Sequence, residues 1–170
     1  MLRGSQVELR AWQEDDVSPL LALRNDVALQ NMLIAQARPN SVERVRRWLV
    51  DKSGREDGLF FVIAELTSQR CLGYLQLIDM HPLHGTAELG ICIAPGAQGQ
   101  GYGREALRLL EDYAHRMFSL RKIVLRVRAD IPAAKFYPKI GYREVGCLRS
   151  HVHVDGQYLD VLMMEKILFP

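Results

Sequence analysis

The chain has 170 residues, of which 48% are hydrophobic and 25% are charged, and its formal net charge is +2. A chain of this length can bury a core without disulfides or metals, and we expect residues 1–170 to form one domain. So small a charge excess argues against a nucleic-acid-binding protein, although it is compatible with a local basic site for an anionic cofactor.

The number of cysteines and the lack of long apolar runs indicate the cellular compartment of the protein. Cys71, Cys92 and Cys147 are odd in number and form no CxxC pair, which argues against a disulfide framework or a zinc site and favours reducing conditions. The first residues lack the apolar core of a signal peptide, and no apolar run approaches the ~20 residues that span a bilayer. We therefore expect a cytoplasmic protein with no membrane partner.

The first third of the chain predicts one strand and two helices. Residues 7–12 are expected to form the strand, and three acidic residues at 14–16 suit the first turn of a helix, where the helix dipole favours negative charge. A second helix should follow Ser41, which is a suitable N-cap. The residues expected to face the core from these helices are Leu20, Leu21, Leu23, Val27, Val45, Trp48 and Leu49.

The rest of the chain alternates between strand and helix patterns. Asp130 is the expected cap of a short helix, and Asp155-Gly156 is typical of a hairpin turn. The expected strands are 59–66, 72–78, 87–93, 121–127, 142–154 and 157–168, and the expected helices are 103–118 and 131–139. The order β-α-α-β-β-β-α-β-α-β-β predicts an α/β (α+β) fold whose mixed, mostly antiparallel central sheet is flanked by helices.

A glycine-rich turn separates the strand at 87–93 from the next helix. Gly99, Gly101 and Gly103 let the backbone turn tightly and approach a ligand, and the free N–H groups at the start of a helix attract an anion. No Gly-Lys-Ser/Thr follows, and the G-x-G-x-G spacing is not that of a dinucleotide-binding fold. The turn therefore predicts a diphosphate site, with a simple connector as the alternative.

Gln98-Gly99-Gln100-Gly101-Tyr102-Gly103 resembles the Q/R-x-x-G-x-G/A motif of the GNAT superfamily of acetyltransferases. The resemblance implies the GNAT fold and acetyl-coenzyme A as the cofactor. It further implies that the backbone N–H groups from Gln98 to Arg104 bind the pyrophosphate. Ile91 and Ile93 would pair their main-chain groups with the pantetheine arm, much as an added strand does.

A second family motif, N-x-x-A-x-x-x-Y-x-K-x-G-F, is similar to the segment from Asp130 to Tyr142. By this resemblance, Asp130, Ala133 and Tyr137 would contact the coenzyme. Asp130 stands where the family has Asn and cannot donate an amide hydrogen bond, and Tyr142 replaces Phe. The closing hairpin is similar to the subgroup that acetylates ribosomal-protein N-termini, polyamines and amino sugars.

The resemblance implies an N-acetyltransferase that moves an acetyl group directly to a primary amine, in a small molecule or at a protein N-terminus. Because an alkyl ammonium has a pKa near ~10, a base must take its proton. Glu88 is our candidate base, with an ion-paired strand residue as its alternative and His81 and His84 as rivals. Tyr137 is our candidate acid, with a core aromatic residue as its alternative. A backbone N–H near Ile91 would hold the oxyanion.

Several alternatives stay open. The chain could be a non-catalytic acyl-coenzyme A sensor or a nucleotide-binding regulator. Cys92 suggests an acyl-enzyme, although a strand cysteine is more often inert core. Two histidine pairs, at 81/84 and 151/153, lack the third ligand that a metal site needs, so we expect no metal. The acceptor pocket should lie among the first two helices, the loop 80–86 and the last hairpin, and a homodimer stays open.

Overall fold

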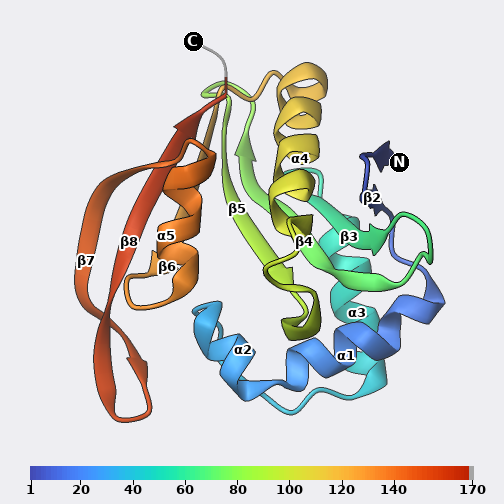
Figure 1. The fold of residues 1–170 in the computed structure, drawn as a ribbon, viewed down its shortest axis with the longest axis horizontal. Coiled ribbons are helices and arrows are strands. Elements are labelled where there is room, and N and C mark those ends of the chain that lie inside the picture. Colours follow the sequence, from blue (N-terminus) through green and yellow to red (C-terminus); the bar gives the residue numbers. More distant parts are fainter. Residues whose placement is uncertain (169–170) are drawn as a thin grey trace.

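The computed structural model describes residues 1–168 (Figure 1). Its strands are β1 (Leu2–Arg3), β2 (Val7–Arg10), β3 (Leu59–Glu65), β4 (Cys71–His81), β5 (Thr86–Ile93), β6 (Lys122–Arg128), β7 (Arg143–Val154) and β8 (Gln157–Ile167). Its α-helices are α1 (Val17–Asn25), α2 (Val27–Met32), α3 (Val42–Ser53), α4 (Tyr102–Phe118) and α5 (Pro132–Phe136). Short 3-10 turns are η1 (Glu14–Asp16), η2 (Pro95–Ala97) and η3 (Tyr137–Ile140).

The strands form one sheet of eight in the order β1-β2-β3-β4-β5-β6-β8-β7. Every neighbouring pair is antiparallel except β5 and β6, which are parallel because α4 carries the chain back across the sheet. The expectation of a mixed, mostly antiparallel sheet with flanking helices is therefore confirmed. The Asp155-Gly156 turn joins β7 to β8, and both residues have the positive φ angles, 48° and 81°, that such turns require.

The helices cover both faces of the sheet and create two cores. One core lies between the sheet and α4 with α5, and includes Leu75, Leu89, Leu110, Ile123 and Tyr137. The other lies beneath α1, α2 and α3, and includes Leu20, Leu29, Val45, Leu49 and Cys92. Successive residues of β5 therefore alternate between the two cores, as the pleat requires.

The N-terminal helices differ from the sequence prediction. Ser41 caps α3 as expected, because its hydroxyl accepts a hydrogen bond from Arg44 N–H. The first helix, however, ends at Asn25, since Asp26 adopts an extended conformation and caps a separate helix, α2, by accepting from Leu29 N–H. This helix was not predicted, and Val27, which we expected in the core, is 59% exposed.

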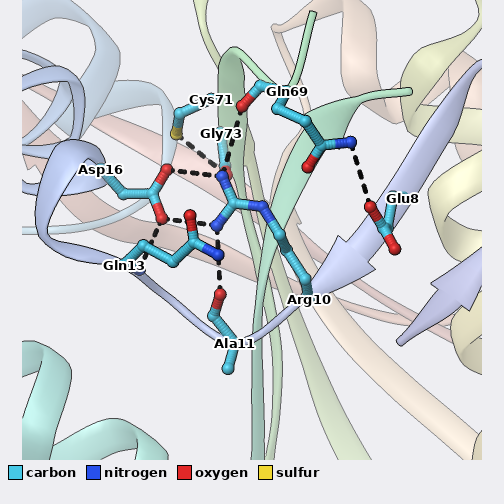
Figure 2. A network of polar contacts seen from close by, with 8 residues as sticks. All are labelled: Glu8, Arg10, Ala11, Gln13, Asp16, Gln69, Cys71 and Gly73. Atoms are coloured by element: carbon cyan, nitrogen blue, oxygen red, sulfur yellow. Dashed lines mark hydrogen bonds and ion pairs between the residues drawn. The ribbon is translucent and has the colours of Figure 1, made fainter. Parts of the chain in front are cut away.

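A buried ion pair ties β2 to its neighbours. Arg10 on β2 binds both carboxylate oxygens of Asp16, at 2.7 and 2.9 Å, and both side chains are at most 4% exposed (Figure 2). Arg10 also donates to the carbonyls of Ala11 and Gln69, and Asp16 accepts from Gln13 N–H. The pair thereby links β2, η1 and the β3–β4 turn.

We expect Asp16→Asn to destabilise the protein by about 3–5 kcal/mol, because it leaves the Arg10 guanidinium buried without a counter-charge. The free energy of unfolding from urea titration measures this effect. The matched control is Glu14→Gln, two residues away, which breaks the exposed pair with Arg46 and should cost far less stability. Equal losses in the two variants would contradict the structural role of the buried pair.

Candidate active site

The parallel strands β5 and β6 separate after three residue pairs. Their register runs from Thr86 opposite Lys122 to Glu88 opposite Val124 and then stops, although β5 continues to Ile93 and β6 to Arg128. In Figure 1, the two halves of the sheet spread apart below this point, and α2 lies beneath the opening. The β6-facing edge of β5 is therefore left without a neighbouring strand from residue 89 onward.

The opening is a cleft of about 930 Å³. Its walls come from both faces of the sheet, because residues of α4 and α5 line it together with residues of α2. The predicted site residues that line the cleft are Glu88, Ile91, Ile93, Gln98, Gly99, Gly101, Tyr102, Gly103, Arg104, Ala133 and Tyr137. The fold thus brings together residues that are up to 49 positions apart in sequence (137 minus 88).

The glycine-rich turn presents a run of free backbone donors. Six consecutive N–H groups, from Gly99 to Arg104, have no acceptor among residues 1–168, and the first helical bond is Glu105 N–H to Gly101 O at 3.1 Å. The N–H of Gln98 is not part of this run, because it donates to Pro95 O. Of the predicted donors from Gln98 to Arg104, the structure thus leaves those of Gly99 to Arg104 unpaired within the described range.

Local geometry explains why these donors are free. Gly99 and Gly101 have φ angles of 76° and 90°, which L side chains rarely adopt, and no atom lies within 3.4 Å of an added Cβ at either position. The side-chain amides of Gln98 and Gln100 donate to the carbonyls of Ile93 and Gly96. These two hydrogen bonds stabilise the turn by occupying backbone carbonyl oxygens. They leave the N–H groups of the turn available at the positive end of α4.

Tyr137 follows α5 and faces the same cleft. Its side chain is nearly buried, and its hydroxyl makes no hydrogen bond to any residue in the described range 1–168. Burial raises the pKa of Tyr137 to about 12, so the hydroxyl is protonated at neutral pH. The structure therefore places a free proton donor at the cleft, although the same ring also packs against Phe136 and Tyr142.

Glu88 lies on the last residue pair before the strands separate. Its Oε1 accepts from Arg126 Nε at 3.0 Å and is 2.9 Å from Nη2, and its side chain is 26% exposed. Since Glu88, Gly90 and Cys92 point to the same face of β5, the carboxylate lies on the α2 side of the sheet, across from α4. Glu88 is thus both ion-paired and open to the cleft.

The sequence comparisons identify the family. Residues 6–143 match the profile of the acetyltransferase (GNAT) domain. The chain belongs to this family of acetyltransferases. It is 28% identical to the spermidine N(1)-acetyltransferase of Vibrio cholerae serotype O1, covering 95% of this chain and 92% of that protein. It is 28% identical to the phosphinothricin N-acetyltransferase of Streptomyces coelicolor, covering 96% of this chain and 98% of that protein.

A solved structure agrees with this assignment. The crystal structure of spermidine N-acetyltransferase from Vibrio cholerae in complex with CoA and spermine superposes with a TM-score of 0.87 at 28% identity, covering 97% of each chain. This GNAT chain is accordingly an N-acetyltransferase with acetyl-coenzyme A as its cofactor. The residues present fit that cofactor, because six unpaired N–H groups suit a diphosphate and the free edge of β5 suits an amide-containing arm.

Two predicted cofactor residues of this GNAT domain do not line the cleft. Gln100 turns its amide back to Gly96, and Asp130 binds Arg128 with both oxygens, at 3.0 and 2.6 Å. The prediction that Asp130 caps α5 is wrong, because Ile131 occupies the N-cap position and makes no side-chain cap bond. Arg128 also donates to Asn31 O, so this ion pair anchors α2 to β6.

The lining of the cleft matches the pocket that we predicted for the acceptor only in part. We expected that pocket among the first two helices, the loop 80–86 and the last hairpin; α2, Leu33 and Ile34 line the cleft, whereas α1, α3, that loop and the described part of the hairpin do not. Sequence reasoning missed Leu29, Met32, Leu33, Ile34, Gln76 and Arg126. The Asp26 N-cap was the one local signal for α2, whereas nothing local marks Gln76, whose role depends on the pairing of β4 with β5.

The other two candidate bases lie outside the cleft. His81 and His84 stack on each other at 4.1 Å in the β4–β5 turn, and neither is among the described residues that line the cleft. Within residues 1–168, no cluster of three or more His, Cys, Asp or Glu side chains could hold a metal ion. None of the helices in that range is long and apolar enough to cross a membrane.

Proposed function

We propose that this GNAT domain transfers the acetyl group to a primary amine by direct attack in a ternary complex. The observation that supports this most is the opening between β5 and β6. It joins the N–H groups of the glycine-rich turn, on the α4 side, to Glu88, on the α2 side. An acetyl donor bound on the α4 face and an amine bound on the α2 face would meet at the edge of β5.

Gly99 to Arg104 would hold the diphosphate of the cofactor, and the edge of β5 at Ile91 and Ile93 would align its arm. When bound, acetyl-coenzyme A supplies an acetyl group activated as a thioester. Glu88 would take the proton of the attacking amine, directly or through a water, since an ammonium near pKa ~10 has no free electron pair. The Tyr137 hydroxyl would donate a proton toward the leaving sulfur.

The surroundings of Cys92 support direct transfer over an acyl-enzyme. The side chain is 1% exposed and lies in the core beneath α1 and α3. Burial raises its pKa to about 12, so almost none of the reactive thiolate exists at neutral pH. A nucleophile that is buried and protonated is unsuited to forming a covalent intermediate.

We expect Glu88→Gln to lower kcat/KM by about 10²-fold at pH 7, with part of the loss recovered at higher pH, where more of the amine is already neutral. Binding of coenzyme A should not change, because Glu88 lies on the acceptor side. The control is Glu144→Gln on the exposed strand β7. A wild-type rate in Glu88→Gln would remove this residue from the mechanism.

A mass-detected acceptor screen tests the function as a whole. The purified chain is incubated with acetyl-coenzyme A and a panel of polyamines, amino-sugar nucleotides, phosphinothricin and peptides with free N-termini, and thiol release is followed in parallel. We expect an acetylated amine and one thiol for each acetyl group transferred. Coenzyme binding without acetylation of any amine would favour a sensor, and nucleotide binding without coenzyme affinity would favour a regulator.

A further inference from the structure

The cleft wall formed by α2 carries no charge. The sequence from Val27 to Ala37 contains no Asp, Glu, Lys or Arg. Apolar side chains from this stretch line the cleft, namely Leu29, Met32, Leu33 and Ile34. The α2 side of the cleft thus suits the hydrocarbon part of a ligand.

Carboxylates are nearly absent from the whole cleft. Among its lining residues within 1–168, Glu88 is the single acidic one, and it is bound to Arg126. Arg104 adds a second positive charge at the start of α4. Arg104 belongs to the turn assigned to the diphosphate and Arg126 neutralises Glu88, so the described lining offers a ligand with several ammonium groups no free carboxylate as a counter-charge.

Ile34 is held in a strained conformation at this wall. Its φ angle is 57°, in the left-handed region where glycine or asparagine usually ends a helix and where a β-branched residue is rare. Its side chain nevertheless lines the cleft. Strained residues cluster at functional sites, and an isoleucine at this position keeps the wall apolar where a glycine would leave a gap.

Gln76, one of the residues that line the cleft, carries a hydrogen-bond acceptor that is unpaired in the described part of the chain. Its Oε1 is buried without a partner among residues 1–168, although buried polar atoms are nearly always paired. The side chain lies over Gly90, because an added Cβ on that glycine would be 3.0 Å from Gln76 Nε2. Gln76 therefore lies beside the point where β5 and β6 have just separated, because it pairs with Gly90, two residues beyond Glu88 along β5.

We propose that the acceptor is a primary amine with a single positive charge and an apolar body, oriented by a hydrogen bond from its nitrogen to Gln76 Oε1. This inference rests on the proposed function. A neutral amide can align an amine without needing a second counter-charge, and the α2 wall receives the hydrocarbon. A polyamine would instead bring two or more further ammonium groups into a cleft that offers none of them a free carboxylate.

Three acceptors with one, two and three amino groups test the class. Hexylamine, 1,6-diaminohexane and spermidine are compared by kcat/KM at one pH and ionic strength, with mass detection of the acetylated product. We expect hexylamine to be preferred over spermidine by at least about tenfold, with the diamine between them. A preference for spermidine over hexylamine would overturn the proposal.

Two variants test the residues. Gln76→Leu should lower kcat/KM for hexylamine by about tenfold or more while the Kd for coenzyme A is unchanged, as expected of a positioning residue. Gln76→Glu should raise the spermidine-to-hexylamine ratio by about tenfold, because it adds the missing counter-charge. Gln157→Glu, at the exposed start of β8, is the matched control and should leave both rates unchanged.

The outcomes separate this inference from the function on which it rests. If the chain binds coenzyme A but acetylates no amine, the proposed function fails and this inference fails with it. If amines are acetylated but Gln76→Leu behaves like the wild type, transfer stands and the role of Gln76 is refuted. Thermal denaturation of each variant shows that the comparison is made between folded proteins.

Discussion

Gly101→Val should weaken the binding of coenzyme A by at least about 100-fold. Gly101 has φ 90° and ψ −12° immediately before α4, a conformation that costs an L-residue about 1–2 kcal/mol. A valine would relieve the strain by rotating the backbone, which moves the neighbouring N–H groups away from the diphosphate. Each hydrogen bond to a charged group contributes about 1.5–3 kcal/mol, so the loss of two accounts for the expected change.

Isothermal titration with coenzyme A measures this loss, and Gly156→Val is the matched control. Gly156 also has a positive φ, 81°, and open space around it, but it lies in the β7–β8 turn and does not line the cleft. Its variant should lose a similar amount of stability and keep the wild-type affinity. If Gly101→Val bound coenzyme A as tightly as Gly156→Val, the turn would not be the diphosphate site.

Tyr137→Phe should lower kcat by about 10²-fold while leaving the affinity for coenzyme A and the free energy of unfolding nearly unchanged. The hydroxyl has no hydrogen-bond partner among residues 1–168, so its removal breaks no contact in the folded state. Because burial raises the pKa of Tyr137 to about 12, the wild-type hydroxyl keeps its proton from neutral pH up to about pH 11. The donor should therefore cause no decline in kcat over that range.

The neighbouring Tyr142→Phe gives the opposite pattern and serves as the control. The Tyr142 hydroxyl donates to the buried Glu111 at 2.9 Å, and Glu111 also binds Lys166. Its removal should cost about 1–3 kcal/mol of stability and leave kcat unchanged. Steady-state kinetics and urea denaturation on both variants distinguish the two roles, and a wild-type kcat in Tyr137→Phe would exclude it as the acid.

Tertiary packing decided which side chains of α4 and β6 are buried, in ways that the local pattern of apolar and charged residues does not indicate. On α4 the buried residues are Ala106, Leu107, Leu110, Glu111 and Ala114, which include a charged glutamate, whereas the apolar Met117 is 66% exposed. Arg126 and Arg128 lie two residues apart, yet the Arg126 side chain is 53% exposed, whereas Arg128 is 8% exposed and paired with Asp130. The spacing of apolar residues alone does not show how far around the helix the core extends. It also does not show which arginine forms an ion pair with a carboxylate.

The sequence by itself determined the element order from residue 59 onward, the glycine-rich turn and the family, because these depend on local chemistry. Positive φ angles at Gly99 and Gly101, the Ser41 cap and the Asp155-Gly156 turn are each set by a few adjacent residues. Only the tertiary structure decided where β5 leaves β6, which face carries Glu88, and that α2 and Gln76 complete the cleft. Those features depend on strand register and on contacts between distant residues, which have no signature in any short segment of the chain.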